Sequence, residues 1–314
     1  MSSNKTLITL TLLFSLSIIT GCSELRVLEP KGPVGEDQKE LIIYSLWFML
    51  GIVVVVFGLF GYMVFKYRDR PGRGNKDYEP EQDGNLKVEI IWTIIPLIIV
   101  TLLSIPTVDT LFDLEKPPQS ANEEEPLVVY ATSADWKWFF SYPEQGIETV
   151  NYLHIPTERP IEFRLSSADS MAALWIPALG GQKYNMAGMQ TILYLQADEE
   201  GVYDGRNSNF NGEGFSLQTF QVHAEEDTAF KEWVNKIKNE KPELTQDQYN
   251  ELLKPSIIGE MAFSNTHLEW VDHGTMMGSD YSIKRHQNAY EKKLHLKSLD
   301  KADAEEEGDA DEAQ

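Results

Sequence analysis

The chain has 314 residues, with 49 acidic against 27 basic side chains and a formal net charge of −22. This acidity argues against a nucleic acid partner, which requires a basic binding surface. The length allows one sizeable domain in addition to membrane segments. Cys22 is the only cysteine, so an internal disulfide is excluded.

The first 22 residues have the pattern of a secretory signal peptide. Lys5 precedes the apolar run LITLTLLFSLSII of residues 7–19, which is too short to span a membrane. The run leads into TGC, which resembles a bacterial lipoprotein processing site. The pattern predicts a signal peptide over residues 1–21 and a lipidated Cys22 at the start of a segment 22–40. An uncleaved signal anchor with an incidental Cys22 is the alternative.

Two long apolar runs predict a transmembrane hairpin over residues 41–111. Residues 41–65 and 90–108 carry no charged side chain, and a helix of about 20 residues crosses the hydrocarbon core. The connecting loop 66–87 is rich in lysine and arginine, which marks the cytoplasmic side. Both ends of the mature chain are therefore expected outside the cell, in agreement with lipidation of Cys22.

The remainder of the chain predicts a linker over residues 112–125 and a β-rich domain over residues 126–285. In PIEFRLSS, residues 160–167, apolar and polar residues alternate with the period of two of a half-buried strand. Similar runs separated by Gly, Pro, Asn and Asp favour a sandwich or a barrel. The other runs are PLVVYAT, WKWFFSYP, TVNYLHIP, TILYLQA and LQTFQVHA.

Helical patterns follow the β-rich segment. Apolar residues recur at helical spacing from Phe230 to Ile237. A second short helix is predicted to begin at a Thr245/Gln248 capping box and to stop before Pro255. Residues 286–314 end in a run of Asp, Glu and Ala, which predicts an acidic disordered tail.

The order of these segments resembles subunit II of the heme-copper respiratory oxidases over residues 22 to about 225. The similar pieces are VEIIWTIIP at the start of the second helix, then DWKWFFSYP, then DSMAALWIPALGGQKYNMAG. The resemblance implies an α+β membrane protein: a two-helix transmembrane hairpin followed by an extracellular cupredoxin-like β-sandwich, here with added short helices.

The stretch YDGRNSNFNGEGFSLQ, residues 203–218, has the spacing of a metal loop without its ligands. Copper-carrying members of the family hold a dinuclear centre with one earlier His and the motif C-x-E-x-C-x3-H-x2-M. Copper of this kind needs soft thiolate and imidazole donors, so the resemblance implies no metal on this chain. Gly205, Gly212 and the asparagines suit turns with positive φ, so the loop is expected to keep its fold without the metal. In chain order, the positions that match the ligands are Ala172, Asn207, Asn209, Asn211, Phe215 and Gln218.

Loss of the copper centre is the mark of the quinol oxidases, and PKGPVGE, YATSADWKW, SADSMAALWIP and WVDHG look most like the Gram-positive type. The resemblance implies a complex that oxidises menaquinol, reduces oxygen to water and translocates protons. Heme and copper are expected on subunit I, with no cofactor on this chain. A membrane-anchored binding or sensory lipoprotein is the alternative, whereas the missing ligands argue against a copper-carrying cytochrome c oxidase subunit.

Glu89 opens the second helix within VEIIWTIIP. Ionisable residues at membrane spans are functional candidates, and in the resembling oxidases the acid at this position stands at the entrance of a proton path. Pairing with Lys87 or capping of the helix N-terminus is an equally weighted alternative.

Other aromatic, histidine and methionine residues are interpreted as structural, because the histidines lack paired ligand spacing and thioether pairs without His or Cys are more often core filling. This group comprises Trp136, Trp138, Met186, Met189, His223, His267 and His273.

Overall fold

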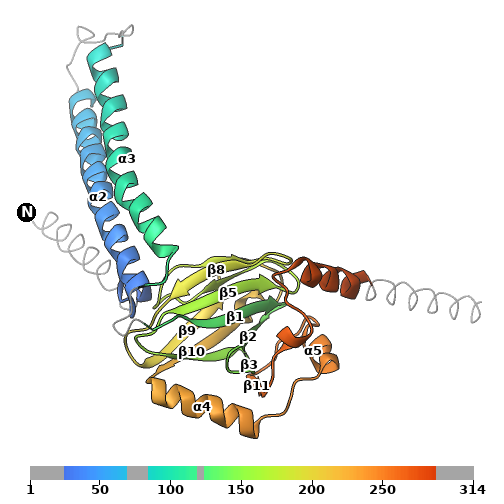
Figure 1. Ribbon diagram of the computed structural model, residues 1–314. Helices are drawn as coiled ribbons and strands as arrows, with labels where there is room; N and C mark the ends of the chain where they lie inside the picture. The colour runs from blue at the N-terminus through green and yellow to red at the C-terminus, as the bar shows by residue number, and fades with distance from the viewer. Residues whose placement is uncertain (1–24, 69–83, 119–123, 288–314) are drawn as a thin grey trace, which may run out of the picture. The chain divides into compact units, whose positions relative to one another are not determined.

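The computed structural model describes residues 25–68, 84–118 and 124–287 (Figure 1). The predicted signal peptide, the lipidation position Cys22, most of the predicted cytoplasmic loop and the tail after residue 287 lie outside these residues. The described chain forms two compact units, a helical unit of residues 36–116 and a β-rich unit that holds the rest. Each unit is described by itself.

Two helices, α2 (Pro33–Tyr67) and α3 (Leu86–Leu114), are each long and apolar enough to cross a membrane. They run side by side, and the Tyr44 hydroxyl donates to the Leu102 carbonyl over 3.3 Å. α2 begins inside the segment that was expected to precede the hairpin, and α3 continues into the predicted linker. Both helices extend beyond the uncharged runs because the absence of charge marks the membrane core, whereas the helix continues for as long as backbone hydrogen bonds and polar terminal residues permit.

The β-rich unit contains two sheets (Figure 1). The larger has the order β11-β3-β2-β1-β5-β8 and the smaller β4-β10-β9-β6-β7. Most neighbours are antiparallel, but β1 pairs with β5, and β10 with β4, in parallel. Their bounds are β1 Leu127–Ala134, β2 Lys137–Tyr142, β3 Ile147–Val150, β4 Tyr152–Pro156, β5 Ile161–Ser167, β6 Ala172–Trp175, β7 Lys183–Asn185, β8 Thr191–Leu195, β9 Gly201–Asn207, β10 Thr219–Glu225 and β11 Met261–Phe263.

The main core follows the alternation seen in the sequence. On β5, Ile161, Phe163 and Leu165 are fully buried while Glu162 and Arg164 are half-buried. Aromatic rings from both sheets meet, since β10 places one ring against two rings of β2. The ring of Phe220 lies 5.6 Å from that of Trp138 and 5.0 Å from that of Phe140. The predicted strands and the sandwich architecture are therefore confirmed.

A helical extension follows β10, and we use this name for residues 226–287. The two predicted helices are present as α4 (Asp227–Glu240) and α5 (Gln246–Leu252), and the capping box of Thr245 and Gln248 is formed. Residues 276–287 form a further helix that the sequence did not predict. Its buried residues are Gly278 and Ser282, so this helix lacks the apolar stripe on which helix prediction depends.

Candidate functional site

The segment between β9 and β10 occupies the place that the motif assigned to the copper loop. It includes the short 3₁₀ helix η3 (Phe215–Leu217). β6, whose first residue Ala172 matches the earlier histidine, pairs with β9 through Leu174 and Asn207. The structure therefore brings the six positions into one region of the smaller sheet.

Three of the six side chains form a cluster of neutral amides, which we call the amide cluster: Asn207, Asn211 and Gln218. The Gln218 Oε1 atom accepts hydrogen bonds from Asn207 Nδ2 at 2.9 Å and Asn211 Nδ2 at 2.8 Å. Asn207 Oδ1 accepts from the backbone N–H groups of Ala173 and Asn209, both at 2.9 Å. The loop is thus closed by direct amide contacts.

The other matched positions lie around this cluster. Asn209 donates from Nδ2 to the Met171 carbonyl over 3.0 Å. Phe215 turns toward Phe210, with 5.6 Å between the ring centroids. Ala172 is fully buried and contributes only its methyl group. The structure therefore joins three of the six positions through their side chains and leaves three at the margin.

The amide cluster does not fit a dinuclear copper centre. A centre of this kind needs thiolate and imidazole donors, whereas asparagine and glutamine are neutral and here use their amides to bind one another and the backbone. Within the described ranges, no group of three His, Cys, Asp or Glu side chains is arranged to hold a metal ion.

Glycines let the loop fold tightly beside Trp136. Gly212 has φ +115°, as the sequence suggested, and a Cβ at Gly214 would lie 2.2 Å from Trp136 Cδ2. Gly205 was expected to need positive φ, and this was wrong. Glycine is needed at this position because there is no room for a side chain: a Cβ there would lie 2.1 Å from the ring of Phe220.

The tryptophans and histidines interpreted as structural make packing and hydrogen-bond contacts. Trp136 Nε1 donates to the Asn211 carbonyl over 3.4 Å, and Trp138 is fully buried in the core. His267 Nδ1 lies 2.7 Å from Glu148 Oε2, and His273 Nε2 lies 2.9 Å from the Tyr249 hydroxyl. Burial, and secondarily His267, lowers the pKa of His273 to about 3.

His223 also makes a ring contact, since it stacks on His154 with 4.5 Å between centroids. For Met189 the core-filling interpretation was wrong, because its side chain is 52% exposed. Met189 belongs to a tight turn closed by a bridge to Met186, and a turn residue at the surface has no core to fill.

A second group of polar residues near the loop was missed, and we call it the charge cluster: Asp135, Lys137, Asp169 and Arg285. Lys137 is fully buried, and burial lowers its pKa to about 8. The available sequence signal was a lysine between aromatic residues in DWKWFF, in a strand with both faces buried. Asp135 lies two residues away in the same stretch, whereas Asp169 and Arg285 come from two distant segments, so local spacing could not have revealed the whole cluster.

Glu89 lies in the helical unit, in the first turn of α3. The helix is capped by Asn85, whose Oδ1 accepts from the Lys87 backbone N–H over 3.0 Å. Glu89 is half-buried within this chain and is not the capping side chain.

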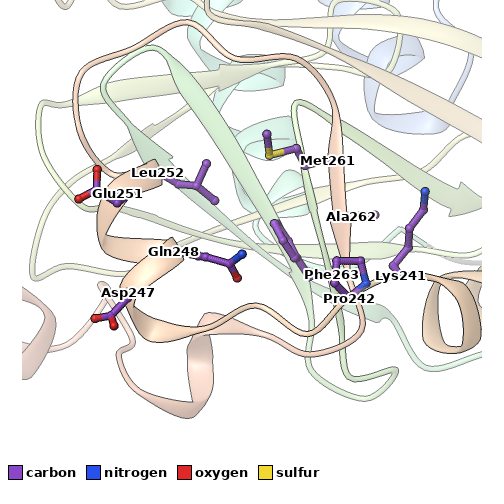
Figure 2. A pocket seen from close by; sticks show the side chains of 9 residues that line it. All are labelled: Lys241, Pro242, Asp247, Gln248, Glu251, Leu252, Met261, Ala262 and Phe263. Carbon is purple, nitrogen blue, oxygen red and sulfur yellow. The ribbon is translucent and has the colours of Figure 1, made fainter.

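A groove lies elsewhere on the β-rich unit, between α5 and the edge strand β11 (Figure 2). Its volume is about 630 Å³. Leu252, Met261 and Phe263 supply apolar walls, while Asp247 and Glu251 lie at the α5 side. None of the residues predicted from the sequence as functional lines this groove.

Comparison with known proteins decides the family. Residues 24–110 match the model described as the transmembrane domain of cytochrome c oxidase subunit II. Quinol oxidase subunit 2 of Bacillus subtilis strain 168 is 57% identical over 270 residues, which cover 86% of this chain and 84% of that protein. The chain belongs to the subunit II family of the heme-copper oxidases.

A second relative agrees with this membership. Quinol oxidase subunit 2 of Bacillus cereus strain ATCC 10987 is 48% identical and covers 85% of this chain and 92% of that protein. Among solved structures, the periplasmic domain of cytochrome oxidase subunit II from Bradyrhizobium japonicum aligns with 38% of this chain and 95% of its own length, at 22% identity and a TM-score of 0.35. The predicted fold class, with two apolar helices followed by a β-sandwich with added short helices, and the assignment to a respiratory oxidoreductase complex are confirmed.

Proposed function

We propose that this subunit II belongs to a quinol oxidase and carries no redox centre of its own. The amide cluster is the observation that supports this proposal most strongly, because neutral amides occupy positions that match copper ligands. Without a metal centre in this domain, a soluble cytochrome has no electron acceptor here. A quinol dissolved in the membrane can instead reach the catalytic subunit directly.

In this proposal the heme and copper lie on subunit I, and the complex couples quinol oxidation to the reduction of oxygen to water with proton translocation. The names of the two Bacillus relatives agree with quinol as the donor. The resemblance of WVDHG and PKGPVGE to the Gram-positive type supports menaquinol. The role of this chain is then to complete the complex and to cover subunit I.

We further propose that the β-rich unit is extracellular and that the mature chain begins at lipidated Cys22. Basic residues in the loop 66–87 support the topology. The apolar run that ends in TGC supports lipidation. Mass spectrometry of the amino-terminal peptide tests the second point, and an unmodified terminus at Met1 would contradict it.

We propose Glu89 as the entrance of a proton path in α3. Asn85 supplies the capping side chain of this helix, which supports a role for Glu89 other than capping. Glu89→Gln keeps the shape and removes the titrating proton, and should slow quinol oxidase turnover while heme spectra and assembly stay normal. Lys87→Gln is the matched control. Unchanged turnover in an assembled Glu89→Gln complex would remove the proton-path role.

A donor assay tests the proposed function. The complex purified in mild detergent should contain heme and consume oxygen with a reduced menaquinone analogue. Reduced soluble cytochrome c should support no oxygen uptake. Uptake driven by cytochrome c would contradict the proposal, and a preparation without heme would favour a binding or sensory lipoprotein.

A further inference from the structure

We propose that the helical extension orders the metal-free loop, with Arg285 and Lys137 as its positioning residues. The contacts of the loop are the same whichever electron donor the complex uses. The extension lies beyond the part of the chain that resembles the copper-carrying subunits. It approaches the same segments that support the loop.

The extension is held by cations at the end of α5. The last carbonyls of a helix have no partner within it, and positive charge is favourable there. Arg285 Nη1 donates to the Leu253 carbonyl over 2.9 Å, and Lys137 Nζ donates to the Lys254 carbonyl over 2.8 Å. Lys137 belongs to β2, so the end of α5 is tied directly to the larger sheet.

Arg285 also connects the last described helix to the segment between β5 and β6. It donates from Nη2 to Asp169, whose carboxylate accepts from His286 Nε2 as well, at 2.7 Å. The Asp169 side chain is 2% exposed. A buried carboxylate that lost Arg285 would be left with an uncompensated charge, so this contact fixes residues 276–287 on the sandwich.

The same segments hold the loop. Asn211 Nδ2 donates to Ser170 Oγ over 3.4 Å, and Ser170 Oγ donates to Asp135 Oδ1 over 2.9 Å. Gln218 Nε2 donates to the Lys137 carbonyl over 3.3 Å. The amide cluster and the charge cluster are therefore linked through the residues next to Asp169 and through Lys137.

The charge cluster adds contacts that the neutral amide cluster does not provide. Metal bonds would cross-link β6 and the two ends of the loop, whereas neutral hydrogen bonds contribute only about 1 kcal/mol each. The extension adds charge-assisted contacts to the segments that hold the loop. Arg285 contacts Asp169, and the Lys254 carbonyl accepts from Lys137. The ordered loop then holds Phe210 and Leu217, which are 76% and 56% exposed, in one arrangement.

Hydrogen exchange on the intact complex tests the proposal. Arg285→Met keeps the length of the side chain and removes its charge, and exchange of the loop amides of residues 208–217 should then accelerate by about tenfold to a hundredfold, as expected for loss of a charged hydrogen bond. Lys231→Met is the matched control, because Lys231 pairs with Asp227 on exposed α4 of the same extension and should leave loop exchange unchanged.

Coupling between two regions is reciprocal, which provides a second test. Asn211→Ala should accelerate exchange of residues 276–287 while strand β5 stays protected. Because Asn211→Ala leaves Arg285 in place, it tests the same coupling even where the Arg285→Met complex does not assemble. Freed residues 276–287 with unchanged loop exchange in Arg285→Met, or an unaffected helix in Asn211→Ala, would overturn it.

Discussion

The amide cluster and the charge cluster lie on neighbouring segments but are built in opposite ways. The amide cluster is neutral, and its three members lie in one continuous motif from Asn207 to Gln218. The charge cluster combines a β1–β2 turn, strand β2, the β5–β6 segment and the last described helix. Positions that match a metal motif can therefore be located in the sequence alone, whereas the contacts that surround them can be located only in the folded structure.

The largest expected effect concerns the charge cluster. Asp169→Ala leaves Arg285 without its carboxylate partner in a largely buried place, and breaking such pairs costs about 3–5 kcal/mol. The free energy of unfolding of the β-rich unit, from hydrogen exchange of its slowest amides, should fall by this order. Asp227→Ala removes an exposed partner of Lys231 and should cost below about 1 kcal/mol.

Equal losses in the two Asp variants would contradict a special role of the buried carboxylate.

The amide cluster should respond less strongly. Gln218→Met removes the oxygen that accepts from Asn207 and Asn211, leaving buried donors unsatisfied at a cost of about 1–3 kcal/mol. The same exchange measurement checks this value. Gln221→Met, at an exposed position of β10, is the control and should be near neutral. A Gln218→Met loss larger than that of Asp169→Ala would reverse the proposed ranking.

Lys137 gives the charge cluster a dependence on alkaline pH that neutral amides lack. Burial lowers its pKa from 10.5 to about 8, so the unfolded chain holds more protons between these values. The free energy of unfolding should therefore rise with pH from about 8 to 10.5. Lys137→Met should flatten this rise in a pH series of unfolding measurements, and an unchanged slope would refute the assignment.

His273 should affect stability at acid pH, whereas Lys137 does so at alkaline pH. The pKa of His273 falls from 6.5 to about 3, so stability is complete above pH 6.5 and is lost as pH falls toward 3. Unfolding measured from pH 7 to pH 4 should show this loss, and His273→Gln should reduce it. An equally steep acid loss in His273→Gln would assign it to other groups.

The smallest effect tests a contact distant from both clusters. Thr245→Ala removes the capping box of α5, with a typical cost of about 1 kcal/mol. Exchange of α5 amides should accelerate while Gln218 and the loop remain protected. Loop amides that accelerate equally would show that the whole extension, rather than Arg285 and Lys137, orders the loop.

Sequence periodicity predicted most of the fold because single segments carry their own signals. Phe163 and Leu165 alternate along a strand, and Phe230 and Ile237 share one face of α4. The helix over residues 276–287 lacked such a signal, since polar contacts of Arg285 and neighbouring residues hold it. The uncharged runs located α2 and α3, and helical structure extends beyond those runs.

The candidate site was predicted in part for the same reason. The spacing from Asn207 to Gln218 is local, so the loss of metal ligands could be read directly. The convergence of Asp169 and Arg285 depends on pairing between segments more than 100 residues apart. Neither composition nor spacing contains that pairing.

Copper content is the most direct test of a subunit II without a metal centre. Per complex, the purified protein should contain only the copper assigned to subunit I. A variant with the six ligands restored, Ala172→His, Asn207→Cys, Asn209→Glu, Asn211→Cys, Phe215→His and Gln218→Met, should gain copper. Copper bound to the unaltered chain, released by Asn207→Ala and Asn211→Ala, would contradict the account.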